Sequence, residues 1–300
     1  MTGNDMKSYI DLHMHSIYSD DGEFSPADLV RMASEAGIRI MAITDHNCAR
    51  ANEEAEKSAE NYNIRYIKAI ELDCTYHDID LHLLGYHINY KSPDFEKIEN
   101  NIQNQSRKTS VENLRLTREF GFDVSEEELN AISEKGYWKD IWSGEMFAEV
   151  ILGKKEYLDY EILRPYRSGG TRSGNPLVNF YWDFYSQGKP CYAKMFFPPL
   201  EDAISIIKDN GGKAVLAHPG NNLKNRYELF DEIVKLGIDG VEAFSSYHDK
   251  PSSEHFYNEA LKHNLMITCG SDFHGKVKPL VRLGESGCFI DQGEIERRIF

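Results

Sequence analysis

Two histidines separated by one residue give the first indication of chemistry in this chain. His13 and His15 flank Met14 at the end of the apolar run Tyr9–Leu12. Since successive side chains of a strand alternate in direction, both imidazoles lie on one face of the predicted strand. Two neutral imidazoles that face the same way are half of a metal site.

Other residue types that bind metal ions recur in short motifs along the chain. They are Asp20, His46, Glu71, His82, His218, Asp272 and His274. With His13 and His15 this makes nine candidate ligands, more than the four that hold a single zinc ion. Six of them lie at or just beyond the carboxyl ends of predicted strands: His13, His15, His46, Glu71, His218 and Asp272. In parallel α/β barrels that rim is where active sites are built.

The elements that position these residues alternate in the βαβ manner in two parts of the chain. Ser25 and Pro26 predict the start of a helix, and Gly37 predicts its end. Strands are predicted at 8–13, 39–44, 65–71, 80–87, 213–217, 240–244 and 265–270. Strands with intervening helices in this arrangement predict an α/β barrel.

Residues 92–190 interrupt the alternation with charged helical sequence. We therefore predict a barrel formed by residues 1–91 and 191–300, with an inserted, mainly helical subdomain at 92–190 that acts as a substrate cap. A glycine-rich basic stretch, 164–174, contains Arg164, Arg167 and Arg172. Two interpretations of this stretch remain open at this point: a solvated linker, or a mobile basic lid over an anion.

Composition limits the classes of function. The 300 residues are 41% hydrophobic, and no apolar run approaches the roughly 20 residues that a membrane span requires. The five cysteines have no paired spacing and the first residues do not resemble an export signal, so a cytoplasmic location is expected. A formal charge of -15 argues against stable binding of duplex nucleic acid. An anionic substrate would require a local positive centre, which a metal cluster would supply.

The order of the motifs resembles the PHP (polymerase and histidinol phosphatase) family. The motifs are His13–Ser16, Ser19–Gly22, Thr44–His46, Ile70–Glu71, His82–Gly85, Ala217–Gly220 and Ser271–His274. The resemblance covers residues 9–90 and 195–290 and implies a distorted (β/α)7 TIM-like barrel with three divalent ions of zinc, iron or manganese. It implies one ion on His13, His15, Glu71 and Asp272, a second on Asp20, His46 and His274, and a third that Glu71 shares with His82 and His218.

The implied activity is hydrolysis of a phosphomonoester by a hydroxide that bridges two of the ions, with Glu71 and Asp272 in catalytic positions. The insertion resembles that of the branch that acts on nucleotide phosphates: 5'-mononucleotides, nucleoside 3',5'-bisphosphates or the 5' ends of short RNA. His248 ends another predicted strand and is either the acid that protonates the leaving oxygen or a surface histidine. Asp11, on the face of His13, is expected to hydrogen-bond a ligand imidazole.

Two departures from the nucleotide branch affect the expected phosphate contacts. Asn221 stands where many members have an arginine, and Trp142–Phe147 stands where an arginine-containing motif is expected. Substrate contacts are therefore expected from Arg172, Lys194, Asn221 and His248. Two alternatives remain: a histidinol-phosphate phosphatase, which the insertion argues against, and a non-catalytic metal-stabilised PHP module.

Overall fold

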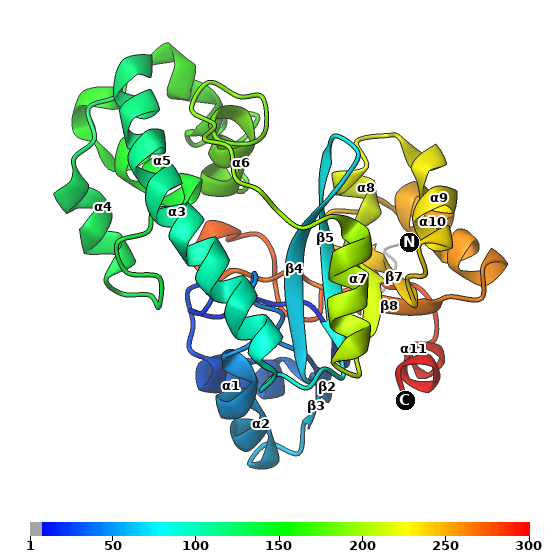
Figure 1. The fold of residues 1–300 in the computed structure, drawn as a ribbon. Helices are drawn as coiled ribbons and strands as arrows, with labels where there is room; N and C mark the ends of the chain where they lie inside the picture. Colours follow the sequence, from blue (N-terminus) through cyan, green and yellow to red (C-terminus); the bar gives the residue numbers. More distant parts are fainter. Residues whose placement is uncertain (1–7) are drawn as a thin grey trace.

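The computed structural model describes residues 8–300 and has an α/β fold (Figure 1). In the N-terminal part the elements are β1 (Ile10–Asp11), α1 (Pro26–Ala36), β2 (Ile40–Met41), α2 (Ala51–Glu60), β3 (Arg65–Tyr66), β4 (Ala69–Tyr76) and β5 (Ile79–Tyr86). The middle of the chain is helical, with α3 (Pro93–Phe120), α4 (Glu126–Ser133), α5 (Gly144–Gly153), the short helices η1 (Lys155–Tyr157) and η2 (Glu161–Tyr166), and α6 (Pro176–Phe184).

Helices and strands alternate again in the C-terminal part of the chain. Its elements are α7 (Leu200–Asp209), β6 (Lys213–Leu216), α8 (Pro219–Asn222), η3 (Tyr227–Leu229), α9 (Phe230–Lys235), β7 (Gly240–Ser245), α10 (Lys250–Lys262), β8 (Met266–Gly270), η4 (Gly275–Val277) and α11 (Gln292–Ile299). The predicted helix at 26–36 is confirmed: the Ser25 side chain caps its first turn, and Gly37 ends it with a φ of 88°.

The strands form two sheets. β1, β2 and β3 are parallel, whereas the second sheet has the order β4-β5-β6-β7-β8. In that sheet β5 is antiparallel to both β4 and β6, and β6, β7 and β8 are parallel. The single strand predicted at 65–71 is in fact two, and the second continues to Tyr76 as one arm of a hairpin. The prediction of uniform βαβ units is therefore wrong between residues 65 and 86.

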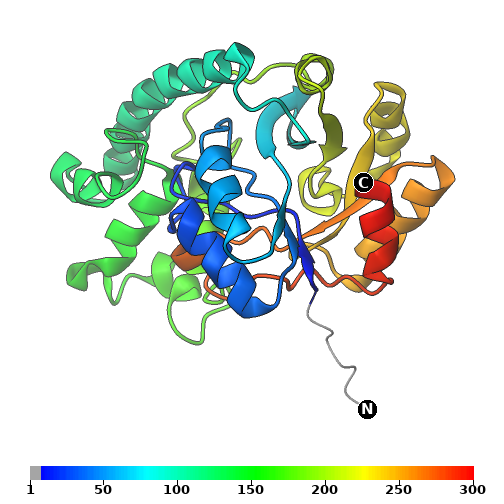
Figure 2. The same ribbon diagram turned by 90° about the horizontal axis from the view of Figure 1, so that it is seen from below.

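The two sheets approach each other along both margins without a continuous ladder, so the predicted closed barrel is not confirmed. On one side the amide of Leu12 donates to the carbonyl of Cys269 at 3.0 Å. On the other, the amide of Glu71 donates to Asp45 at 3.2 Å and that of Asn47 donates to Glu71 at 2.7 Å. Helices α1 and α2 lie against the first sheet, and α7, α10 and α11 lie around the second (Figure 2).

The inserted helices gather beside the sheets at the upper left of Figure 1, and the long helix α3 connects the two regions. They have their own apolar core, which includes Leu129, Phe147 and Phe180. The segment between α4 and α5 is fixed to the N-terminal loop, because the amide of Tyr137 donates to Ile17 at 3.2 Å and the indole of Trp138 donates to Tyr18. Within residues 8–300, no helix combines the length and the apolar composition needed to cross a membrane.

Candidate metal centre

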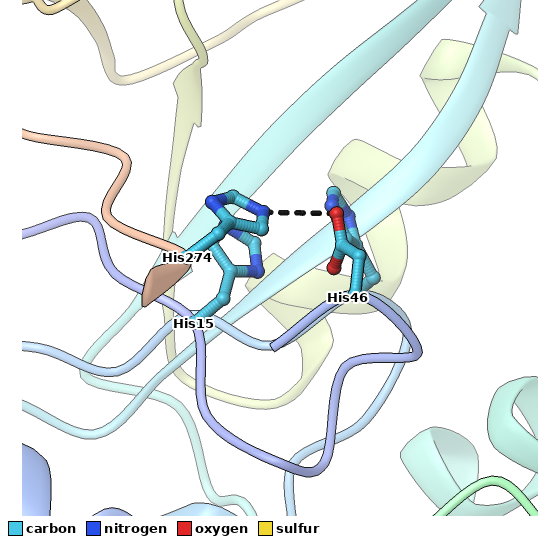
Figure 3. A group of neighbouring side chains, drawn as sticks. His15, His46 and His274 are labelled. Carbon is cyan, nitrogen blue, oxygen red and sulfur yellow. Dashed lines mark ion pairs between the residues drawn. The ribbon is translucent and has the colours of Figure 1, made fainter. Parts of the chain in front are cut away.

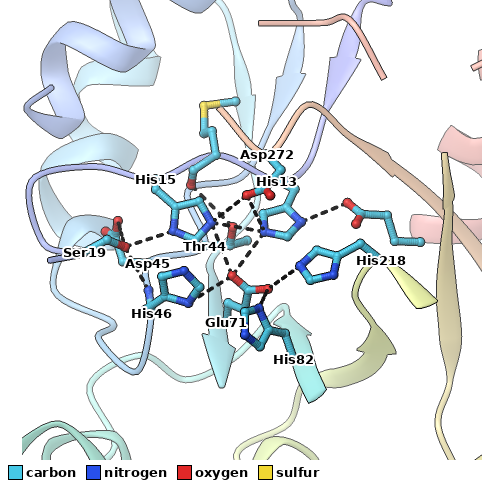
Figure 4. A network of polar contacts seen from close by, with 12 residues as sticks. His13, His15, Ser19, Thr44, Asp45, His46, Glu71, His82, His218 and Asp272 are labelled. Atoms are coloured by element: carbon cyan, nitrogen blue, oxygen red, sulfur yellow. Dashed lines mark hydrogen bonds and ion pairs between the residues drawn. The ribbon is translucent and has the colours of Figure 1, made fainter. Parts of the chain in front are cut away.

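The residues that follow β1 and β8 converge on Glu71 of β4. His13 and His15 point their Nε2 atoms at each other, 3.1 Å apart, and each lies 3.2 Å from Oε2 of Glu71 (Figure 4). Oδ1 of Asp272 lies 3.4 Å from Nε2 of His13 and 3.1 Å from that of His15. All four residues are buried. The alternation of side chains along the extended segment after β1 therefore places both imidazoles on one face, as the sequence indicates.

Four histidines are held by hydrogen bonds at Nδ1. The partners are Oε1 of Glu242 for His13 (3.0 Å), Oγ of Ser19 for His15 (2.9 Å), Oδ1 of Asn222 for His218 (2.7 Å) and the carbonyl of Asp272 for His274 (2.9 Å). The carboxylate, amide oxygen and carbonyl can only accept. Ser19 donates its own proton to Asp45, so it accepts from His15. Nδ1 therefore carries the proton in each neutral ring, and the Nε2 lone pair faces the cluster.

Glu71 links these residues to His46 and His82. Its Oε2 lies 3.3 Å from Nδ1 of His46, and its Oε1 lies 3.0 Å from Nδ1 of His82 and 3.1 Å from Nε2 of His218. Asp73, two residues further along β4, lies 3.3 Å from Nε2 of His82. Because Glu71 and Asp73 share one face of the strand, both carboxylates reach the same cluster.

The carboxylate beside His274 belongs to Asp21 and not to Asp20. Oδ2 of Asp21 lies 3.1 Å from Nε2 of His274, and Asp21 forms a compact group with His15, His46 and His274. The three imidazoles of this group face one another in Figure 3. The neighbouring Asp20 lines the adjoining cavity instead. The position that the sequence analysis gave to Asp20 is therefore corrected to Asp21, while the other eight predicted ligands lie together in the structure.

The charges of the cluster favour a cation. Burial alone would lower the pKa of His13, but Glu242, Glu71 and Asp272 raise it well above its usual value. Burial alone would raise the pKa of Glu71, yet the imidazoles of His13, His82 and His46 hold it well below its usual value. By contrast, burial lowers the pKa of His15 to about 3, so this ring is neutral at pH 7 and its lone pair is free.

The backbone at two of these residues is in a conformation that non-glycine residues seldom adopt. His218 has a φ of 54° and Asp272 a φ of 55°. Such strain costs of order 1–3 kcal/mol per residue and persists where the surrounding structure imposes it, typically at functional sites. The left-handed turn at His218 comes just after β6 and directs the imidazole toward Glu71. The turn at Asp272 comes just after β8 and directs the carboxylate toward His13 and His15.

Three residues that contact the predicted ligands were missed in the sequence. Glu242 is fully buried in β7, and a carboxylate within an apolar strand is itself a signal, since burial of a charge requires a partner. Lys278 places its Nζ 2.6 Å from Oδ2 of Asp272 and is also buried. Asp73 follows Glu71 at the strand spacing of two. Asp11, expected to bind an imidazole, instead accepts from the backbone amides of Ser271 and Gly284, both at 2.8 Å.

Of Asn221, Arg172 and Lys194, which were predicted to contact the substrate, one lines the cavity beside the cluster and two do not. Asn221 lines the cavity beside the cluster. Arg172 is bound to both carboxylate oxygens of Asp183 within the insertion, at 2.8 and 3.0 Å, and does not line the cavity. Lys194 is exposed, with its Nζ 4.9 Å from the centre of the Phe196 ring, and it too lies outside the cavity lining.

His248 is bound through both ring nitrogens to the backbone. Its Nδ1 lies 3.0 Å from the carbonyl of Ala243, and its Nε2 accepts from the amide of Gly220 at 3.1 Å. Burial lowers its pKa to about 4, so the ring is neutral at pH 7. It does not line the cavity. In this arrangement the Nδ1 proton of His248 is donated to Ala243, so the ring has no proton free for a leaving oxygen.

A cavity of ≈ 260 Å³ lies between the cluster and the inserted helices. Its floor includes His46, His82, His218, Asp272 and His274 from the two sheets. The opposite wall comes from α3, the segment before α5, and α6, with the aromatic side chains of Trp138, Trp142, Tyr181, Trp182 and Tyr185. A small molecule bound here would lie against the cluster on one side and against the insertion on the other.

The donor set fits divalent metal ions. Imidazole nitrogens and carboxylate oxygens suit zinc, iron and manganese. Nδ1 of His46 and Nε2 of His274 lie within ion-pair distance of Glu71 and Asp21 but form no hydrogen bond of suitable geometry within residues 8–300, and Oδ1 of Asp21 forms none there either. Buried polar atoms are normally satisfied, so these atoms are available to a cation.

Comparison with known proteins identifies the family. The model of the PHP domain matches residues 11–169, which is more than half of the chain. The chain therefore belongs to the PHP domain family, and the curated relatives that it matches are named as enzymes that act on phosphate esters.

Several curated proteins match over nearly their whole length. The chain is 24% identical over 278 residues to phosphoribosyl 1,2-cyclic phosphate 1,2-diphosphodiesterase of Eggerthella lenta, covering 91% of this chain and 97% of the relative. It is 26% identical to 3',5'-nucleoside bisphosphate phosphatase of Chromobacterium violaceum, covering 88% and 87%. It is 25% identical to a 5'-3' exoribonuclease of Haemophilus influenzae, covering 90% and 91%. The three relatives differ in substrate but all act on phosphate esters.

Solved structures agree on the fold. A protein from Bifidobacterium adolescentis described as a metal-dependent phosphoesterase superposes with a TM-score of 0.76 at 22% identity, over 97% of this chain and 95% of the other. An amidohydrolase from Chromobacterium violaceum with bound sulfate superposes with a TM-score of 0.77 at 23% identity, over 97% of both chains. The arrangement of the sheets and the insertion is thus shared with these proteins along almost the entire chain.

Proposed function

We propose that this protein hydrolyses a phosphomonoester of a nucleotide, with divalent ions held by His13, His15, Asp21, His46, Glu71, His82, His218, Asp272 and His274. The observation that carries the proposal is the pair of Nε2 atoms of His13 and His15, 3.1 Å apart beside two carboxylates. Each ring has its Nδ1 bound elsewhere, so two Nε2 atoms and two carboxylate oxygens converge on one point. Three ions are proposed because His13, His274 and His82 each lie in a different group of donors, and these groups overlap only at His15 and Glu71.

Bound ions would activate water as a nucleophile and offset the charge of the phosphate. The protein's own residues supply the orientation. Glu71 reaches both sides of the cluster, since its two oxygens face different histidines. Lys278 lies beside Asp272 at the wall of the cavity and adds a positive charge next to the position where a phosphate would lie.

We further infer that the two sheets form a distorted barrel and that residues 92–190 form the cap over its mouth. The hydrogen bonds between Leu12 and Cys269 and between Glu71 and Asp45 support the first point, since they join the sheets at both margins. The separate apolar core of the insertion supports the second. The substrate is inferred to be nucleotide-like because two of the named relatives act on a nucleoside bisphosphate and on RNA.

A screen of phosphate release tests the proposal. The substrates are 5'-AMP, adenosine 3',5'-bisphosphate, a short oligoribonucleotide and histidinol phosphate, each with Mn²⁺ and with Zn²⁺. Release from at least one nucleotide is expected, and His13→Ala should lower kcat/KM by more than about 100-fold, because even indirect partners of a metal ligand cost 10- to 100-fold. His77→Asn is the matched control: His77 is exposed and has a φ of 53°, which asparagine tolerates.

The outcomes separate the alternatives. Release from histidinol phosphate alone would replace the proposed substrate. Binding of metal without hydrolysis of any ester would indicate a non-catalytic module. Equal activity of wild type and His13→Ala would assign the phosphate release to a contaminant and overturn the proposal.

A further inference from the structure

Two aromatic side chains of the insertion lie across the cavity from the candidate metal centre. Tyr181 and Trp182 belong to α6, and both line the cavity. The floor on the other side contains His46, His82 and His218. Both aromatic side chains are half-buried, so part of each remains accessible to a bound molecule. A small molecule with its phosphate at the metal centre would therefore extend toward these two rings.

The helical period of α6 divides its apolar side chains between two faces. Val178, Tyr181 and Trp182 are three and four residues apart, and all three line the cavity. Phe180 and Phe184 lie on another face, where their rings stack within the core of the insertion with centres 4.3 Å apart. The core is thus filled mainly from one face of α6, and the other face is left for the cavity.

Trp182 does not support an apolar core. Within residues 8–300 its ring belongs to none of the clusters of buried apolar side chains, nor to the half-buried side chains packed against them. By contrast, Trp138 and Trp142, which also line the cavity, are buried members of two of these clusters. Pockets for small molecules are lined mainly by apolar and aromatic side chains, so an indole that borders a cavity and supports no core suits contact with a ligand.

The rings of Tyr181 and Trp182 form a corner. Their centres lie 5.1 Å apart, and their planes meet at 69°. Gly144, at the start of α5, permits close packing behind the corner, because a Cβ added there would lie only 2.7 Å from Cδ2 of Tyr181. A flat aromatic ligand in such a corner can stack on one ring and meet the other with its edge, which are the two arrangements that aromatic pairs prefer.

We propose that Tyr181 and Trp182 bind the organic group of the substrate, and that this group carries a flat aromatic ring such as a nucleobase. The inference rests on the proposed phosphomonoesterase function and adds to it the side chains that select the ester. It predicts that a phosphate ester with such a ring is hydrolysed better than the same ester without one. Because stacking acts on binding and not on the reacting phosphate, the preference is expected in KM more than in kcat.

The test compares 5'-AMP with ribose 5-phosphate, which has a hydroxyl where 5'-AMP has its base, at fixed Mn²⁺. Stacking of a base on an aromatic side chain changes affinity by a factor of roughly 5 to 150. For wild type we therefore expect kcat/KM to be at least about fivefold higher for 5'-AMP. Trp182→Ala should raise KM for 5'-AMP by at least about fivefold and leave KM for ribose 5-phosphate unchanged. Trp182→Phe keeps a ring and should keep most of the preference.

A second variant and a matched control complete the set. Tyr181→Leu removes the other ring but keeps an apolar side chain beside Gly144, and the preference for 5'-AMP should fall. Tyr160→Ala is the control, because Tyr160 is an aromatic residue of the insertion that is 45% exposed and does not line the cavity. It should leave both KM values unchanged.

Failure of the inference and failure of the proposed function give different results. If no ester releases phosphate, the proposed function fails. If wild type hydrolyses ribose 5-phosphate as well as 5'-AMP, the phosphomonoesterase activity stands and the recognition of an aromatic ring is wrong. That comparison needs only wild type, so it decides the matter even if a variant does not fold. A preference for 5'-AMP that is unchanged in both Trp182→Ala and Tyr181→Leu would overturn the role of the two rings.

Discussion

The contact between Glu242 and His13 gives the most direct test of how the metal centre is built. Oε1 of Glu242 lies 3.0 Å from Nδ1 of His13, and both side chains are completely buried. A hydrogen bond to a charged group contributes about 1.5–3 kcal/mol, which corresponds to a factor of roughly 10 to 150 in an equilibrium constant. Glu242→Gln keeps an oxygen that can accept from Nδ1 but removes the charge that makes His13 a stronger donor to a cation.

We predict that Glu242→Gln weakens binding of the metal ion at His13 by about 10- to 100-fold, the usual range for the indirect partners of metal ligands. Isothermal titration of the metal-free protein with Zn²⁺ and with Mn²⁺ measures the change. The matched control is Glu254→Gln on α10, where the carboxylate is half exposed and lies outside the centre. If Glu242→Gln protein is folded and binds metal within twofold of wild type, the reasoning that Glu242 strengthens His13 as a ligand is refuted.

Three further predictions concern stability. Gly270→Ala should lower the free energy of unfolding by about 1–3 kcal/mol in urea titrations, because the added Cβ would lie 2.2 Å from Cβ of His13. The control is Gly153→Ala: a Cβ added there would have no heavy atom within 4 Å, so this substitution should change the free energy of unfolding little. His248 stays neutral to about pH 4 in the folded state. The neutral ring therefore contributes at most about 3 kcal/mol to the stability of the fold, and this contribution is present above pH 6.5 and lost as the pH falls toward 4. The His248→Gln variant should lose less stability over this interval than wild type, in thermal unfolding followed by circular dichroism. Dialysis against EDTA should lower the Tm and Mn²⁺ at 100 times its Kd should restore about 2.7 kcal/mol; an unchanged Tm would indicate that no ion stabilises the fold.

The helix signals in the sequence predict the local structure well where a cap residue and a hydrophobic period agree. Ser25, Pro26 and Gly37 give the bounds of α1, and the structure contains both the cap hydrogen bond and the left-handed terminal glycine. The β4–β5 hairpin was not predicted, because its tip at His77 lacks the Asn-Gly or Asp-Gly pair that indicates a two-residue turn. Whether the sheets close is a property of contacts between residues far apart in the chain, which local periodicity does not report.

In the candidate site, too, the local sequence predicts some features, whereas others depend on contacts between residues far apart in the chain. The spacing of His13 and His15 follows from the strand period, so their common direction could be predicted. Asp20 and Asp21 lie in a loop, where no period decides which of two adjacent carboxylates faces His274. Glu242 could have been found from its place among apolar residues, since a buried charge needs a partner. The contact of Lys278 with Asp272 depends on the path of the chain after β8 and has no local signal.

The sheets and the insertion contribute different parts of the candidate site. The proposed ligands all come from the sheets and the loops that follow them, so the donor set does not depend on the sequence of α3–α6. The insertion contributes the opposite wall of the cavity, so its side chains bear on which ester fits there. Because this wall holds none of the proposed ligands, substitutions on it should change the ratio of kcat/KM between substrates while binding of the metal ions stays the same.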